Sequence, residues 1–166
     1  MTEDDITDLA RTVGRAARRR RVMVATAESC TGGGVATAIT RISGSSRWFE
    51  RGFVTYTNTA KKEMLGVSAR TLDDHGAVSE QVAVEMAQGA LAFSHADVAV
   101  AVTGVAGPAG GSREKPVGLV HFAWAARGEP VQSRVFRFRG DRAAVRLQSV
   151  HVALQGLAQL LRKPGR

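Results

Sequence analysis

The sequence is poor in cysteine, in aromatic residues and in long apolar runs. Its 166 residues include one cysteine, Cys30, and 5% are aromatic. A single cysteine excludes an internal disulfide framework and fits a reducing compartment. No run reaches 18 apolar residues, and the acidic start Met1–Asp5 lacks the apolar segment of a secretory signal. We therefore expect a cytoplasmic protein with no membrane partner.

Histidine is too scattered to suggest a metal centre. The four histidines, His75, His95, His121 and His151, have neither metal-ligand spacing nor the spacing of a catalytic dyad. A cysteine nucleophile normally needs a histidine partner, so Cys30 is interpreted as a small, buried apolar residue. We expect no metal and no cofactor.

Positive charge is in excess and unevenly distributed. The net charge is +8, and six arginines lie between positions 11 and 21. Clustered arginines suit a phosphate backbone, but the low aromatic content offers no platform for stacking bases. A solvated basic helix face is therefore favoured over a nucleic-acid surface, and the same field would attract small anionic substrates. The sequence leaves homo-oligomerisation open.

The hydrophobic pattern predicts helices that alternate with strands. Helices are expected over about 2–20, 34–42, 59–65, 68–75, 80–91 and 142–161, and strands over 22–27, 48–58, 97–103, 117–125 and 131–138. The last two strands are predicted to form an antiparallel hairpin, and the tail from Lys163 is expected to fray. The alternation favours an α/β class: a three-layer α/β/α single domain over residues 1–166, with a mixed β-sheet.

The stretch 25–34 concentrates the groups that could do chemistry. A short apolar strand runs into Glu28, Ser29, Cys30 and Thr31, and three glycines then lead into a helix. Unpaired N–H groups at a helix start can hold an anion or an oxyanion. Successive side chains of an extended segment point in opposite directions, so only one of Ser29 and Cys30 can face a site.

A serine nucleophile needs a base, and lysine can serve once burial lowers its pKa. Lys61 and Lys62 follow a strand whose end carries Tyr56 and Asn58. If that strand lies beside the strand that ends at Ala27, such a lysine could reach Ser29. Taken alone, a lysine on a short helix is more often solvated.

Two further features can be interpreted either as ordinary surface structure or as parts of a binding site. The glycine-rich loop over 104–116 follows the most apolar strand, and it suits a ligand-binding loop and a flexible surface loop equally. Arg142 and Arg146 are four residues apart and could hold a phosphate, although two exposed arginines are the simpler explanation.

Taken together, the segments resemble the CinA C-terminal domain family, and within it the stand-alone nicotinamide mononucleotide amidohydrolases. The resemblance covers roughly residues 9–161. The segments that carry it, in family order, are Thr26-Ala-Glu-Ser-Cys-Thr-Gly-Gly33, Gly44-Ser-Ser46 with Trp48-Phe49, Gly52-Phe-Val-Thr-Tyr56 with Asn58 and Lys61, His75-Gly-Ala-Val-Ser79, Thr103-Gly-Val-Ala-Gly-Pro108 with Gly110-Gly111, Lys115-Pro-Val-Gly118, and Gly140-Asp-Arg142 with Val145-Arg146.

The resemblance implies a metal-free serine amidohydrolase. It converts nicotinamide mononucleotide and water to nicotinic acid mononucleotide and ammonia, in the recycling of pyridine nucleotides. The resemblance implies Ser29 as the nucleophile, Lys61 as its base and Tyr56 as a support for proton transfer or for the amide. The alternative is a catalytically weak nucleotide-binding accessory domain linked to competence or DNA damage.

The small-molecule nucleotide substrate implies a set of binding residues. N–H groups at positions 31–33 are the expected oxyanion donors, and the two arginines are expected phosphate contacts. The full set expected to bind substrate is Glu28, Thr31, Gly32, Gly33, Ser45, Asn58, Thr103, Gly104, Gly107, Arg142 and Arg146.

Overall fold

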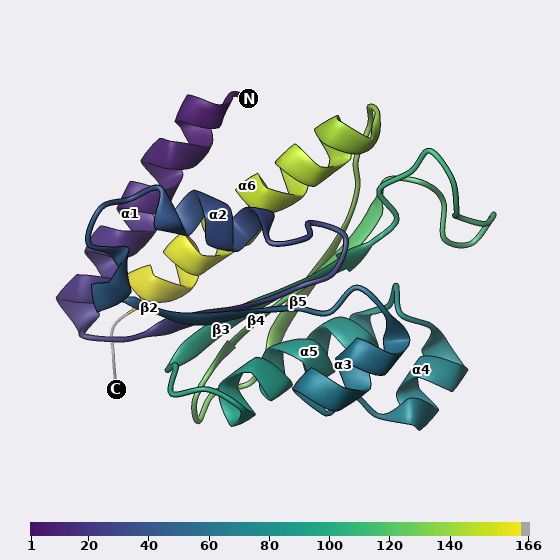
Figure 1. Ribbon diagram of the computed structural model, residues 1–166, viewed down its shortest axis with the longest axis horizontal. Coiled ribbons are helices and arrows are strands. Elements are labelled where there is room, and N and C mark those ends of the chain that lie inside the picture. Colours follow the sequence, from purple (N-terminus) through teal and green to yellow (C-terminus); the bar gives the residue numbers. More distant parts are fainter. Residues whose placement is uncertain (164–166) are drawn as a thin grey trace.

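A five-stranded mixed sheet lies at the centre of the fold (Figure 1). The computed structural model describes residues 1–163, so most of the tail expected to fray lies outside the described residues. The strands follow the order β2-β1-β3-β4-β5 across the sheet. They are β1 (Val24–Glu28), β2 (Phe49–Val54), β3 (Val98–Gly104), β4 (Leu119–Ala126) and β5 (Gln132–Arg137).

The strand directions confirm the mixed sheet and the hairpin. β1 runs parallel to both of its neighbours, β2 and β3. β4 is antiparallel to β3, and β5 is antiparallel to β4. The carboxyl ends of β1, β2 and β3 therefore meet at one edge, which is where ligands bind in open α/β sheets. The long loop after β3 projects beyond that edge (Figure 1).

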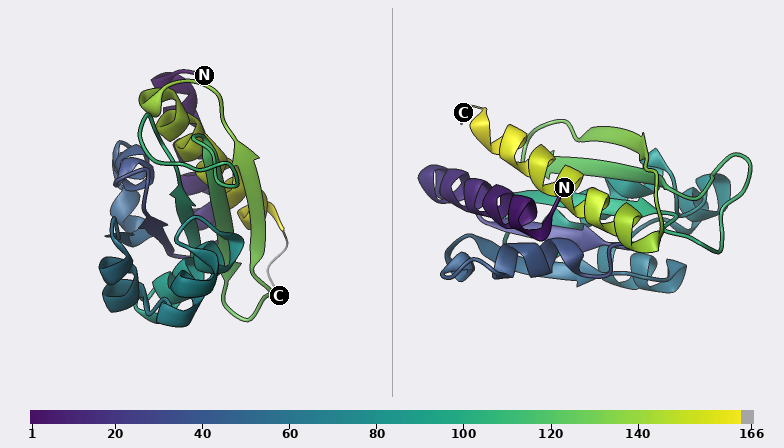
Figure 2. Two further views of the ribbon diagram at one scale, coloured as in Figure 1. Left: turned by 90° about the vertical axis from the view of Figure 1, so that its right-hand side faces the viewer. Right: turned by 90° about the horizontal axis from the view of Figure 1, so that it is seen from above.

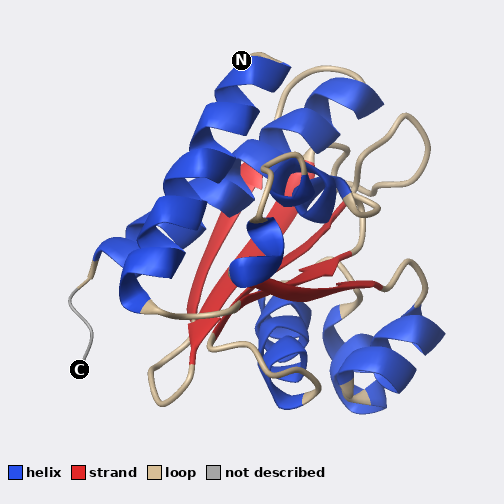
Figure 3. Cartoon of the chain, turned by 60° about the vertical axis from the view of Figure 1, so that its left-hand side comes forward, coloured by secondary structure: helices blue, strands red, loops and turns tan. Residues whose placement is uncertain are grey.

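Helices cover both faces of the sheet, which confirms the three-layer prediction (Figures 2 and 3). On one face lie α1 (Glu3–Arg20), α2 (Gly34–Thr40) and α6 (Arg142–Arg162). On the other lie α3 (Asn58–Leu65), α4 (Ala69–His75) and α5 (Glu80–Ala92), and a 3-10 turn, η1 (Ser45–Arg47), precedes β2.

Local capping explains where several helices begin. The Thr2 side chain accepts a bond from the Asp5 N–H and forms a capping box with it. Ser79 and Asp141 cap α5 and α6, and these caps account for the helix starts predicted at 80 and 142. The strand expected over 48–58 is shorter, because Thr57 caps α3 by accepting a bond from the Ala60 N–H.

The two faces of the sheet carry side chains of different size. Val98, Val100 and Val102 pack in the cluster beneath α1 and α6, whereas Ala99 and Ala101 pack beneath α5. Small residues also let α5 approach α3 closely. A Cβ atom added to Gly89 of α5 would lie 2.0 Å from the Leu65 carbonyl oxygen. The alanine face therefore holds α5, and with it α3, close to the sheet.

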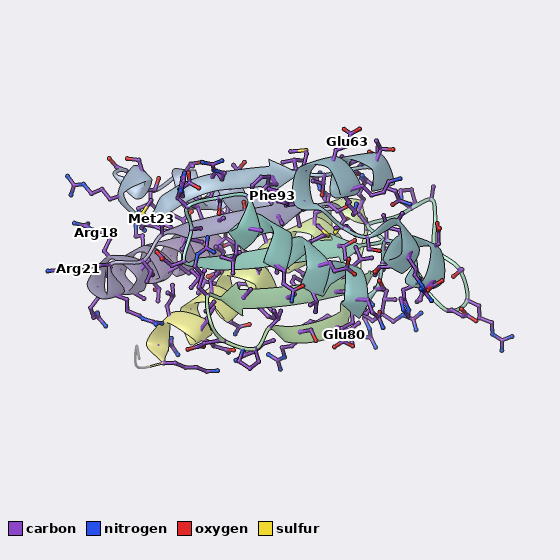
Figure 4. All side chains as sticks on the ribbon, turned by 90° about the horizontal axis from the view of Figure 1, so that it is seen from below. Arg18, Arg21, Met23, Glu63, Glu80 and Phe93 are labelled. Carbon is purple, nitrogen blue, oxygen red and sulfur yellow. The ribbon has the colours of Figure 1, made fainter. Side chains whose placement is uncertain are left out.

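The basic segment forms the end of α1. Arg18 and Arg21 point outward there (Figure 4), while Arg20 donates a 3.2 Å bond to the Leu160 carbonyl of α6. None of the helices within residues 1–163 combines the length and the apolar character needed to cross a membrane.

Candidate active site

A tight turn carries Ser29 away from the end of β1. The Ser29 N–H donates to the Val102 carbonyl at 2.9 Å and so holds this residue beside β3, just past the end of β1. The chain then turns, with the Gly32 N–H donating to the Ser29 carbonyl at 2.9 Å. Gly32 and Gly33 have φ values of 58° and 100°, a region that favours glycine. The glycines of the motif therefore bend the chain from β1 into α2.

Lys61 reaches Ser29 from α3. Its Nζ atom lies 2.9 Å from the Ser29 Oγ atom and donates to the Thr55 carbonyl at 2.8 Å. The Lys61 side chain is only 1% exposed. Burial lowers the pKa of this amine, because the low-dielectric interior disfavours its charged form. The structure thus places a lysine with a depressed pKa against a serine hydroxyl.

A cavity of about 320 Å³ opens in front of this pair. It lies at the carboxyl edge of the parallel strands, between the turn after β1 and the loop after β3. Thr103 at the end of β3 donates to the Ala77 carbonyl at 2.8 Å and fixes that wall. Of the residues predicted from the sequence, the cavity is lined by Ser29, Lys61, Tyr56, Asn58, Thr103, Gly104, Gly107 and Arg142.

Arg142 crosses one side of the cavity at the start of α6. It donates to the Tyr56 hydroxyl at 2.6 Å and to the Gly107 carbonyl at 2.8 Å. Tyr56 itself is 56% exposed, and among the described residues its hydroxyl has no hydrogen bond to Ser29 or Lys61. The phenol therefore belongs to the rim of the cavity and not to the buried pair.

The other residues predicted to bind substrate lie elsewhere. Thr31, Gly32, Gly33 and Arg146 line a separate cavity of about 350 Å³ between α1, α2 and α6. Arg146 donates to the Thr31 carbonyl at 3.2 Å, so the two arginines serve different cavities. Their four-residue spacing places both on α6 but does not make them converge.

Ser45 and Glu28 also lie away from the cavity in front of Ser29. Ser45 begins η1, which precedes β2. It therefore lies near the amino ends of the parallel strands, whereas Ser29 lies at their carboxyl ends. The Glu28 side chain is fully buried and binds the start of α2 instead of facing the cavity. Neither residue lines the cavity in front of Ser29.

Cys30 and the histidines take no part in the contact between Ser29 and Lys61. Burial raises the pKa of the Cys30 thiol to about 11, so the thiolate form is disfavoured. No histidine lines the cavity within residues 1–163. Over the same residues, no three His, Cys, Asp or Glu side chains gather to hold a metal ion.

Sequence reasoning missed some of the residues around the pair. The Thr55 carbonyl holds Lys61, but a backbone contact leaves no side-chain signal in a sequence. Ala77 and Val78 line the cavity from the segment before α5. They belong to the His75–Ser79 motif, so the motif was visible although its place in the fold was not.

Comparison with known proteins gives consistent matches over nearly the whole chain. The model of the CinA C-terminal domain matches residues 6–161. The nicotinamide-nucleotide amidohydrolase PncC of Escherichia coli K12 is 58% identical over 160 residues, which cover 96% of each chain. The protein of the same name from Pseudomonas putida is 55% identical over 157 residues, covering 95% of this chain and 98% of its own.

A solved structure agrees in fold as well. The competence/damage inducible protein CihA from Agrobacterium tumefaciens superposes with a TM-score of 0.93 at 52% identity, covering 96% of each chain. The family model and these relatives all span nearly the full length of the sequence. The chain therefore belongs to the CinA C-terminal domain family.

Proposed function

We propose that the protein is an amidohydrolase that converts nicotinamide mononucleotide and water to nicotinic acid mononucleotide and ammonia, using Ser29 and Lys61. The observation that carries the mechanism is the 2.9 Å separation of the Ser29 Oγ and Lys61 Nζ atoms in a buried setting. Two relatives, 55% and 58% identical, are named nicotinamide-nucleotide amidohydrolases, and this supports the substrate. The role is recycling of pyridine nucleotides in the cytoplasm.

Lys61 acts first as a base. Its lowered pKa increases the share of the neutral amine at any given pH, and one of its N–H groups stays bound to the Thr55 carbonyl. The nitrogen lone pair then accepts the Ser29 proton while Oγ attacks the carboxamide carbon. The carbonyl oxygen becomes an oxyanion, and Lys61 becomes an ammonium group.

The oxyanion needs N–H donors that are not already used. Of the donors predicted from the sequence, the Gly32 N–H is engaged by the Ser29 carbonyl. The Cys30 N–H has no hydrogen bond within residues 1–163, and Cys30 lines the cavity. We assign it as the main oxyanion donor, a contact worth about 3 kcal/mol in other hydrolases.

The second half of the reaction uses the same lysine. Lys61 returns its proton to the leaving amine, so ammonia departs and an ester remains on Ser29. Water then enters, gives a proton to Lys61 and attacks the ester carbon. The carbon–Oγ bond breaks, Ser29 recovers its proton from Lys61, and nicotinic acid mononucleotide is released.

The phosphate of the substrate fits the outer part of the cavity. Arg142 and the glycine loop over 107–111 form this region. Arg142 presents a guanidinium group, which suits a phosphate through paired charge-assisted bonds. Binding there would exchange the bond to the Tyr56 hydroxyl for a bond to substrate, leaving Tyr56 free to contact the nucleotide.

The test is release of ammonia and nicotinic acid mononucleotide from nicotinamide mononucleotide by the purified protein. We expect Ser29→Ala to lose at least about 1,000-fold in kcat, since the nucleophile is removed. Cys30→Ala is the matched control in the same turn: it removes the thiol but keeps the backbone N–H that binds the oxyanion, so its kcat should stay within a few-fold of the unchanged protein. Absence of ammonia release between pH 6 and 9 would favour the accessory nucleotide-binding alternative.

A further inference from the structure

The carboxylate of Glu28 lies behind the nucleophile and on the other side of the sheet. Ala25 and Ala27 of β1 pack beneath α5, so Glu28 points toward the face of α2, as does Val24. Its side chain is fully buried. Within residues 1–163 no lysine, arginine or histidine lies within ion-pair distance of it. A buried polar group without a cation beside it must be held by hydrogen bonds.

Three hydrogen bonds hold this carboxylate. The Thr31 hydroxyl donates to the Oε1 atom at 2.6 Å, and the Val35 N–H donates to the same oxygen at 2.8 Å. The Ala36 N–H donates to the Oε2 atom at 3.1 Å. Val35 and Ala36 lie in the first turn of α2, where N–H groups have no partner within the helix. Glu28 therefore caps α2 from six residues upstream.

The helix has no cap of its own. Its N-cap residue is Gly33, which has no side chain to offer. Two successive glycines with left-handed φ values connect Thr31 to the helix, and glycine is the most flexible residue in a chain. The backbone of Glu28 is fixed in the sheet, where its carbonyl accepts the Thr55 N–H at 2.8 Å. Glu28 is thus bound at both ends of the turn: its backbone is held in the sheet, and its side chain binds the start of α2.

We infer that Glu28 is a positioning residue for the reaction, and that Thr31 works with it as the second half of one clamp. The clamp holds the turn so that the Ser29 Oγ atom and the Cys30 N–H face the substrate at fixed positions. Glu28 neither touches substrate nor exchanges a proton. The inference rests on the proposed function, because it concerns the placement of that nucleophile and that oxyanion donor.

The expected effect falls on kcat. A misplacement of about 1 Å in the reacting groups costs on the order of 100-fold in rate. In Glu28→Gln, the amide oxygen can keep two of the three bonds, while its NH₂ group meets an N–H donor. We expect a loss of about 10- to 100-fold in kcat, with KM changed by less than about threefold, since the cavity walls remain.

Thr31 provides a matched pair of variants. Thr31→Val keeps the shape but removes the hydroxyl donor, and Thr31→Ser keeps the donor. We expect a loss of about tenfold in kcat for the valine variant and activity within about twofold for the serine variant. The double variant Glu28→Gln/Thr31→Val should lose less than the product of the single losses, because both act on one clamp.

The measurements are kcat and KM for ammonia release, normalised to folded protein by circular dichroism well below the melting temperature. The pH profile of kcat/KM in Glu28→Gln should keep the acid limb of the unchanged protein. A shifted limb would make Glu28 an acid–base group, and a raised KM with normal kcat would make it a substrate contact. Either result, or normal kcat in Glu28→Gln, overturns the inference.

Two controls separate the possible failures. If Glu28→Gln does not fold, the Thr31 pair decides, and equal kcat for its valine and serine variants overturns the clamp. Ser29→Ala measures the proposed function separately. Activity retained in Ser29→Ala refutes the serine mechanism, whereas a dead Ser29→Ala beside a fully active Glu28→Gln refutes the clamp alone.

Discussion

The protonation of Lys61 should control both the rate and the stability of the protein. Its side chain is 1% exposed, and burial lowers its pKa from the ordinary value. Only the neutral amine can take the Ser29 proton. We therefore expect kcat/KM to fall about tenfold for each pH unit below that pKa. Each step corresponds to about 1.36 kcal/mol.

The same group links stability to pH with a defined sign. The pKa of Lys61 is lower in the folded chain than in the unfolded chain. Below both values the two states bind the same proton, so this group adds no slope. Between them the unfolded chain binds one proton more, and the free energy of unfolding should rise by about 1.36 kcal/mol per pH unit. Above the unfolded pKa the rise stops.

Comparison with Lys61→Met isolates this effect from every other titrating group. The free energy of unfolding is measured by urea denaturation of both proteins from pH 6 to pH 10.5, and one curve is subtracted from the other. The difference should be flat at low pH and then turn in favour of lysine. The pH at which it turns should equal the midpoint of the acid limb of kcat/KM, since both report the free protein.

Two results would refute this reasoning. A flat stability difference beside a clear acid limb would mean that another group sets the limb. Full activity in Lys61→Arg, whose side chain stays charged throughout this range, would mean that no neutral amine is needed. We expect that variant to be inactive at every pH tested.

Three further predictions follow from single contacts. In steady-state kinetics, Arg142→Ala should raise KM for nicotinamide mononucleotide by about 10- to 100-fold with a smaller change in kcat, because a charge-assisted bond is worth about 1.5–3 kcal/mol. An unchanged KM would refute the proposed contact between Arg142 and the phosphate. Cys30, with a pKa of about 11, should resist iodoacetamide at pH 8, and rapid labelling by mass spectrometry would contradict its burial. Gly89→Ala should lower the free energy of unfolding, measured by urea denaturation, by about 2–3 kcal/mol, because the new Cβ would lie 2.0 Å from the Leu65 carbonyl oxygen. In the control Gly128→Ala the new Cβ meets no atom within 4 Å, so its positive φ should cost only about 1 kcal/mol. Equal losses in the two variants would contradict the close approach of α3 and α5.

Local signals carried the prediction of the fold. The predicted helix starts near 2, 80 and 142 agree with the structure, where Thr2, Ser79 and Asp141 cap the helices. Two strand patterns close together in the sequence predicted the hairpin, and the alternation of helices with strands predicted the three layers. The boundary at Thr57 was less clear, because Phe53 to Tyr56 are β-formers that run directly into the capping residue. When β-forming residues continue past the end of a strand, the predicted strand becomes too long.

The site was harder to predict because it depends on the direction in which each side chain points. Arg142 and Arg146 illustrate the difficulty. Their spacing places them one turn apart on α6, yet a turn of helix is enough to send one toward the Tyr56 hydroxyl and the other toward the Thr31 carbonyl. Ser45 followed from its motif, but a motif names a residue without giving the edge of the sheet on which it lies. The direction of each side chain depends on how the helices pack against the sheet, and the spacing of residues along the chain does not reveal that packing.

Facing direction also explains why Ser29, and not Cys30, meets the lysine. Alternation continues from Ala25 and Ala27, which pack beneath α5, to Ser29, whereas Cys30 packs in the cluster beneath α1 and α6. After β2 the chain crosses to the α5 face, so α3 brings Lys61 to the serine side only. Shifting the turn by one residue would present the thiol to Lys61 and leave the hydroxyl in an apolar core. Two contacts oppose that shift: the Ser29 N–H is bound to the Val102 carbonyl, and the Glu28 carboxylate binds α2 on the face opposite Ser29.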